Sequence, residues 1–184
     1  MKDLMNELHV TIRDEKPGDE SAIRAVTERA FESSEFDHNG EAGLVEKLRS
    51  QNAASISLVA EVSGQLVGHI LFSPATIELK DHCSSGFGLA PVSVLPEFQR
   101  RGIGAKLIAT GLEIAASSDC EFVIVLGHPE HYPKFGFAPA SASNVRCEFE
   151  GVPDEAFMIR WFKQPASVDD RVVAKYHPVL SSLG

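Results

Sequence analysis

The feature that most constrains the fold is one segment, Val92 to Gly104, in which a short strand-like run, a proline and two glycines follow in order. Val92-Ser93-Val94 alternates like a strand, Pro96 marks a turn, and helical spacing begins after Gly102. A strand that turns directly into a helix aims unpaired backbone N–H groups at one point, with the positive end of the helix dipole behind them. The segment therefore predicts a site for phosphate or pyrophosphate.

The side chains of this segment fit such a site. Gly102 and Gly104 place no side chain between an anion and the backbone, and Arg100 and Arg101 add positive charge. The segment lacks the Gly-Lys-Ser/Thr ending of a P-loop, and its spacing is not the dinucleotide pattern G-x-G-x-x-G. The alternative is that the two glycines only let the helix pack closely on the strand.

The rest of the chain reads as alternating strands and helices. Strands are predicted at 9–13, 56–62, 66–79, 87–94, 122–126, 144–149 and 157–162, and helices at 19–31, 41–50 and 101–117. Ser63-Gly64 predicts a tight hairpin turn, and the continuous apolar run at 122–126 predicts a strand buried on both faces. This order indicates one mixed α/β domain over residues 1–184, with a core of about residues 9–164 and a C-terminal extension at 165–184.

Charge and cysteine content exclude several classes of protein. The net charge of -9 argues against nucleic acid as a partner and fits a small, cationic one. Cys83, Cys120 and Cys147 are widely spaced, which predicts free thiols and neither a disulfide framework nor a metal site. We find neither a signal peptide nor the ~18–20 apolar residues that cross a bilayer, so we expect a cytoplasmic protein without a membrane partner.

Pro91 gives a second clue to a ligand. Proline removes a hydrogen bond from a sheet, so its place just before Val92 predicts that this strand separates from a neighbour there. The freed backbone groups would suit an extended ligand that carries amides. An ordinary edge strand is the alternative.

Tyr132 gives the third clue. It follows the buried strand at 122–126, near the end of the sheet where open α/β sheets bind ligands. A phenol there can donate a proton to a departing thiolate. The alternative is a packing tyrosine whose hydroxyl reaches the surface.

These residues resemble the GNAT superfamily of acyl-CoA-dependent N-acyltransferases. The resemblance rests on Val94-x-Pro96-x-x-Gln99-Arg100-Arg101-Gly102-Ile103-Gly104 and on Tyr132-x-x-Phe135-Gly136-Phe137. Further segments are similar to the YhbS-type bacterial branch: Leu89 to Val94, Val152 to Met158, and Tyr176-His177-Pro178.

The resemblance implies an α+β fold, a mixed, mainly antiparallel sheet of six or seven strands flanked by helices and splayed between strands four and five. Acetyl-CoA would be the cosubstrate, with no metal. Its implied contacts are Val92, Ser93 and Val94 along the pantetheine, and Gln99, Arg100, Arg101, Gly102, Ile103, Gly104 and Ala105 around the pyrophosphate. An amine would attack the thioester directly, a backbone N–H of strand four would meet the oxyanion, and Tyr132 would be the general acid.

The sequence departs from the family in its general base, because the run at 122–126 carries no carboxylate. The candidates are His128, Glu130, His131, Glu35, Asp37 and Glu41, although each also reads as a solvated surface residue. The expected function is N-acetylation of a primary amine on a small molecule. A protein or peptide acceptor, an acyl-CoA sensor without turnover and a homodimer remain open.

Overall fold

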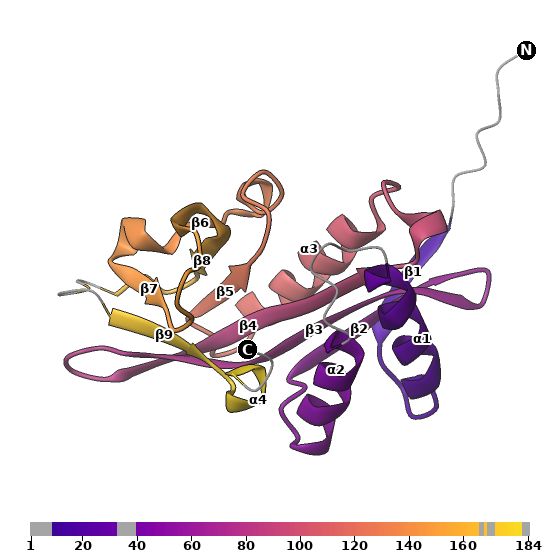
Figure 1. Cartoon of the computed structure of the whole chain (residues 1–184), viewed down its shortest axis with the longest axis horizontal. Coiled ribbons are helices and arrows are strands. Elements are labelled where there is room, and N and C mark those ends of the chain that lie inside the picture. The colour runs from indigo at the N-terminus through magenta and orange to yellow at the C-terminus, as the bar shows by residue number, and fades with distance from the viewer. Residues whose placement is uncertain (1–8, 33–39, 166–167, 169–171, 182–184) are drawn as a thin grey trace, which may run out of the picture.

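One mixed sheet runs through the molecule, with α1 and α2 on one face and α3 on the other (Figure 1). The computed structural model describes residues 9–32, 40–165, 168 and 172–181, and the elements below refer to these residues. The helices are α1 (Glu20–Phe31), α2 (Glu41–Ser50), α3 (Ile103–Ala116) and α4 (Pro178–Ser181). The strands are β1 (Val10–Asp14), β2 (Ile56–Val62), β3 (Gln65–Glu78), β4 (Cys83–Val94), β5 (Phe122–Leu126), β6 (Ala138–Pro139), β7 (Val145–Cys147), β8 (Phe157–Trp161) and β9 (Val172–Tyr176). Short 3-10 helices are η1 (Pro96–Phe98), η2 (Pro133–Phe135), η3 (Ala140–Ser143) and η4 (Asp154–Ala156).

The long strand β3 organises the sheet. It pairs antiparallel with β4 along nearly its whole length, with β2 along its first half and with β9 at its far end, where Ala75 faces Tyr176. The pairs β4–β5 and β7–β9 are parallel, and the other strand pairs are antiparallel. The expected mixed, mainly antiparallel sheet is thus confirmed. The nine described strands exceed the expected number because β6 and β9 were not predicted.

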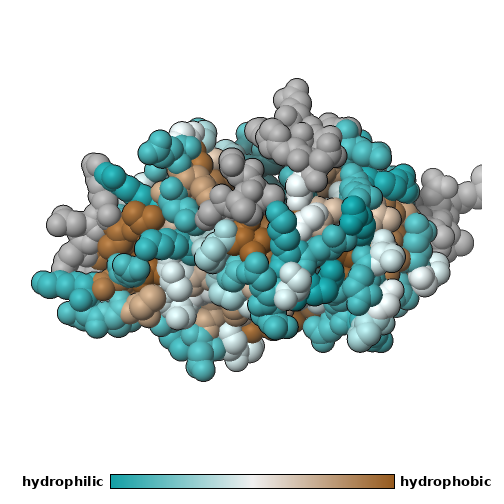
Figure 2. All heavy atoms as spheres, turned by 60° about the horizontal axis from the view of Figure 1, so that its bottom comes forward, coloured by the Kyte–Doolittle hydropathy of each residue, from teal (hydrophilic) through white to brown (hydrophobic). Residues whose placement is uncertain are grey.

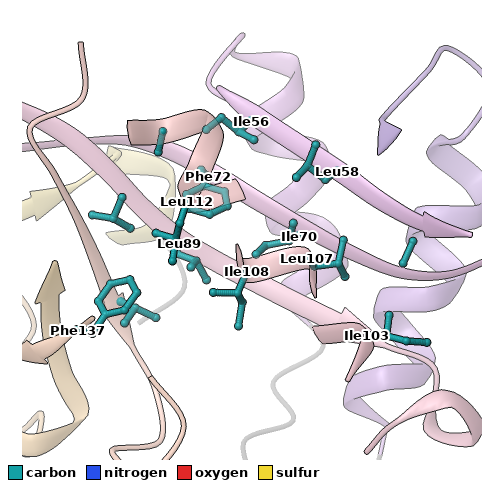
Figure 3. Close-up of a cluster of buried hydrophobic side chains, with 14 of the residues drawn as sticks. Ile56, Leu58, Ile70, Phe72, Leu89, Ile103, Leu107, Ile108, Leu112 and Phe137 are labelled. Atoms are coloured by element: carbon teal, nitrogen blue, oxygen red, sulfur yellow. The ribbon is translucent and has the colours of Figure 1, made fainter. Parts of the chain in front are cut away.

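The face of the sheet under α3 holds the largest part of the core. Ile103, Leu107, Ile108 and Leu112 of α3 lie over side chains of β2, β3 and β4, as Figure 3 shows. Their spacing along the helix gives one apolar stripe, which the sheet buries. This packing holds α3 in place on the sheet, and with it the end of the candidate phosphate-binding segment.

The outer surface is mostly hydrophilic on the face seen in Figure 2. Among the described residues the exposed large hydrophobic side chains are Ile114, Leu126 and Val173. In the same part of the chain, every helix is too short or too polar to span a membrane.

A polar cluster around one buried histidine lies on the other face of the sheet. His69 of β3 is completely buried, and its Nε2 lies 2.9 Å from the hydroxyl oxygen of Ser57. That hydroxyl also donates a hydrogen bond to Glu15, which forms an ion pair with Arg49 at 2.6 Å. Burial, and then the charge of Arg49, lowers the pKa of His69 to about 3. His69 is therefore neutral at physiological pH.

This histidine predicts that acid destabilises the fold. The unfolded chain takes up the proton near pH 6.5, whereas the folded chain takes it up near pH 3, so stability falls as the pH drops between these values. From pH 7 to pH 5 we expect the free energy of unfolding to fall by about 2 kcal/mol on account of this group. Urea unfolding of the wild type and of His69→Gln at both pH values measures it. Equal losses in the two proteins would contradict the assignment.

Candidate functional site

The candidate site begins where β4 separates from β5. Parallel pairing of the two strands runs from Gly86 and Phe122 to Leu89 and Val125, and β4 continues beyond it. At this point a bulge interrupts the pairing of β4 with β3, since Leu89 faces Phe72 but Val92 already faces Ile70. The extra residue bends the strand away from its neighbour. The separation predicted at Pro91 is thus confirmed.

The end of β4 keeps a strand on one side only. His69 and Gly68 of β3 face Ser93 and Val94, and the described residues place no strand along the other side of this stretch. Its backbone groups on that side can therefore pair with an extended ligand, as in strand addition. This supports the prediction that Val92 to Val94 bind one, which stays a prediction.

The loop after β4 presents backbone N–H groups. Gly102, at the N-cap of α3, has a φ of +80°, and Arg100 also has a positive φ, of +58°. The N–H of Lys106 donates to the carbonyl of Gly102 at 3.0 Å, so helix geometry leaves those of Ile103, Gly104 and Ala105 without an intrahelical acceptor. A methyl group added to Gly102 would meet open space. These three amides and Gly102 make up the candidate anion cradle.

Gln99 ties the loop to the strand. Its side-chain Nε2 donates a hydrogen bond to the carbonyl of Val94 at 2.9 Å, so this side chain fixes the loop. Arg100 and Arg101 are exposed, and the guanidinium of Arg101 lies 5.8 Å from the centre of the Phe98 ring. The structure thus brings the end of β4 and the start of α3 together. The long side chains of Arg100 and Arg101 place two guanidinium groups beside them.

Tyr132 lies in the segment after β5, just before η2. Its ring packs on the α3 face of the core, with the Phe137 ring at 5.7 Å and the His131 ring at 5.2 Å. A methyl group on Gly127 would lie 2.4 Å from Cε2 of Tyr132, so this glycine gives the ring its place. Burial raises the pKa of Tyr132 to about 12. The phenol therefore keeps its proton at neutral pH.

The candidate bases lie in different places. His128, Glu130 and His131 share the loop with Tyr132, and burial, followed by the charges of Lys134 and His128, lowers the pKa of His131. Glu41 begins α2, and Glu35 and Asp37 lie outside the described residues. Within the described ranges no three His, Cys, Asp or Glu side chains are placed to hold a metal ion.

A cavity of about 420 Å³ lies on the α3 face. It is lined by Ala109, Leu112, Glu113 and Ala116 of α3, and by Lys134, Phe135, Gly136 and Arg160. The guanidinium of Arg160 donates to the carbonyl of Phe135 at 2.8 Å, which fixes this charged side chain against the segment that follows Tyr132.

Two buried hydroxyl groups lie near the gap, by which we mean the place where β4 and β5 separate after Leu89 and Val125. Neither was predicted as a site residue. Ser73 of β3 faces Gly88 of β4, one residue before the last β4–β5 pair, and Tyr176 of β9 touches the same glycine. Tyr176 appeared in the sequence only as part of a resemblance to a bacterial branch. Its position depends on the pairing of β9 with β3, and no local sequence pattern predicts that pairing.

Comparisons with known proteins identify a family and several similar chains. Residues 21–137 match the model of the acetyltransferase (GNAT) family. Two curated relatives from Escherichia coli K12 are the uncharacterized N-acetyltransferases YjhQ, 40% identical over 80% of both chains, and YhbS, 31% identical over 90% of this chain and 95% of that one. A GNAT family acetyltransferase from Brucella melitensis, solved in complex with acetyl-CoA, is 35% identical over 94% of this chain and 98% of its own, with a TM-score of 0.75. The YhbS structure from Escherichia coli, in complex with CoA, is 30% identical over 96% of this chain and 94% of its own, with a TM-score of 0.83.

Proposed function

The chain belongs to the GNAT family of acetyltransferases, and from this premise we propose that it moves the acetyl group of acetyl-CoA to a primary amine of a small molecule. The amine nitrogen attacks the thioester carbonyl carbon, the C–S bond breaks, and CoA leaves as a thiolate. The nitrogen loses one proton and the sulfur gains one. Amine and acetyl-CoA are bound together, so the transfer needs no covalent enzyme intermediate.

One observation carries the proposal: the anion cradle at the start of α3 adjoins a stretch of β4 that has a strand on one side only. Acetyl-CoA has a pyrophosphate for the first and an amide-bearing arm for the second. Gly102 and Gly104 admit the phosphates to the amides of Ile103 and Ala105, and the dipole of α3 favours their charge. Relatives bound to acetyl-CoA and to CoA support this assignment.

The reacting groups follow from this placement. The thioester lies where β4 and β5 separate, and Tyr132 faces its sulfur from the α3 side. A backbone N–H of β4 meets the oxyanion. The net charge of -9 favours a cationic acceptor, which must lose a proton before it attacks. No described carboxylate follows directly on β5, so we assign that proton to water, with His131, whose ring lies 5.2 Å from that of Tyr132, as the side-chain candidate.

We expect acetyl-CoA to bind one to one and to raise the melting temperature. At a ligand concentration about 100 times Kd, the stabilisation is about 2.7 kcal/mol. Calorimetry measures binding, and free-thiol release across a panel of amines measures transfer. Absence of binding at millimolar acetyl-CoA would overturn the proposal.

A second function, an acyl-CoA sensor without turnover, draws on the missing carboxylate base. It predicts tight binding of acetyl-CoA with no thiol released by any amine. A protein or peptide acceptor would instead show thiol release with lysine-containing peptides and none with small amines.

A further inference from the structure

Tyr176 reaches across the sheet to β4, one residue before the last pair that β4 forms with β5. It stands on β9 and faces Ala75 of β3, yet its ring touches Gly88 on β4, the strand beyond β3. A methyl group on Gly88 would lie 2.4 Å from Cδ1 and 2.6 Å from Cε1 of the ring. The missing side chain at Gly88 is therefore what admits the ring.

Tyr176 and Tyr132 approach this point from opposite faces of the sheet. Tyr176 packs with Phe122 and Ile124 of β5, whereas Tyr132 packs with the cluster that contains Val123 and Val125. Burial raises the pKa of Tyr176 well above the usual phenol value, so its hydroxyl keeps its proton.

The hydroxyl of Tyr176 is buried and has no hydrogen-bond partner among the described residues. The same is true of the hydroxyl of Ser73, which faces Gly88. A buried hydroxyl without a partner costs about 1–3 kcal/mol. The stacked Phe149 ring and the edge-on Phe157 ring would hold a phenylalanine equally well. Packing therefore accounts for the ring of Tyr176 but not for its hydroxyl.

We propose that the Tyr176 hydroxyl donates a hydrogen bond to the carbonyl oxygen of the bound thioester. This rests on the proposed function, since it needs the thioester to lie where β4 and β5 separate. The bond strengthens when nitrogen attacks, because negative charge then gathers on that oxygen. The phenol keeps its proton throughout, so it adds a donor to the backbone N–H of β4. Ser73 provides a second polar group beside the same glycine.

The test is Tyr176→Phe, which removes the donor and keeps the ring. We expect a melting temperature equal to or above that of the wild type, since an unpaired hydroxyl is lost. Calorimetry should show acetyl-CoA binding weakened about three- to tenfold, the worth of one neutral hydrogen bond. The affinity for CoA, which lacks the acetyl group and its carbonyl oxygen, should not change. With an active amine, kcat should fall by about 100-fold.

Ser84→Ala is the matched control. The Ser84 hydroxyl is also buried on β4, but it donates to Glu121 at 2.8 Å. Its loss should lower the melting temperature and leave the acetyl-CoA to CoA affinity ratio unchanged. The proposal is overturned if Tyr176→Phe melts several degrees lower, or if it keeps the wild-type affinity ratio. A third outcome separates the two proposals. If no amine releases thiol from the wild type, but Tyr176→Phe loses affinity for acetyl-CoA and keeps its affinity for CoA, the proposed acetyl transfer is wrong and the hydrogen bond from Tyr176 to the thioester is supported.

Discussion

Replacing Gly102 by glutamate is expected to weaken acetyl-CoA binding by at least about 100-fold, because it places a carboxylate where we propose that the pyrophosphate binds. Two like charges about 4 Å apart near a protein surface repel by about 4 kcal/mol, and 100-fold in Kd is about 2.7 kcal/mol. The new side chain meets open space, so it does not disrupt packing. Calorimetry with acetyl-CoA measures the loss.

Two controls separate charge from backbone strain. Gly102→Gln has the same shape and the same unfavourable positive φ, which costs about 1 kcal/mol, but no charge. Gly151→Glu puts the same charge at another glycine of positive φ with open space around it, after β7 at the far end of the sheet (Figure 1). Both should bind acetyl-CoA much more tightly than Gly102→Glu does. If Gly102→Glu stays folded and binds like the wild type, the phosphate site lies elsewhere.

Tyr132→Phe is expected to lower kcat by about 100-fold, the low end of the range for a lost general acid. KM for acetyl-CoA should change little, since the hydroxyl acts on charge that develops as the C–S bond breaks. The low end follows from acid strength. A phenol with a pKa of about 12 is a weaker acid than a thiol with a pKa of about 8.5, so we expect Tyr132 to stabilise the departing sulfur mainly through a hydrogen bond.

Gly127→Ala tests the same assignment without removing the hydroxyl. Its methyl group would lie 2.4 Å from Cε2 of Tyr132, so the ring must move away. We expect kcat to fall as in Tyr132→Phe, with the affinity for CoA preserved. A fall of less than about tenfold in Tyr132→Phe would make Tyr132 a packing residue. A large rise in KM with kcat intact would make it a cosubstrate contact.

Local patterns predicted the parts of the fold whose partners are close in sequence. Alternation gave β2 and β3, and Ser63-Gly64 gave their turn, because hairpin partners and turn residues are adjacent in the chain. The separation of the strands at Pro91 could be predicted for a similar reason, because a proline removes a hydrogen bond from the strand in which it lies. Ile103 and Gly104 could be placed at the start of α3 from glycine and apolar spacing alone.

What the sequence did not predict depends on distant partners. β6 has two residues, too few to show a period, and β9 is identified by its pairing with β3 and β7. It lies in the part of the chain that sequence analysis treated as an extension. The bulge before Val92 is a property of the register between β3 and β4, and a single strand does not show it. Tyr176 therefore had no sequence signal beyond a resemblance.

The position of β9 also has a consequence for how the chain folds. Its pairing partner on β3 lies about 100 residues away, whereas β2, β3 and β4 join through short turns. Closing a long loop costs more entropy than closing a hairpin, so we expect β9 to dock after those strands. Until then, the edge of β3 at Ala75 to Ile77 is open to the same strand of another copy. Chains refolded at high concentration can therefore exchange β9, and each would then place its own Tyr176 against Gly88 of its neighbour.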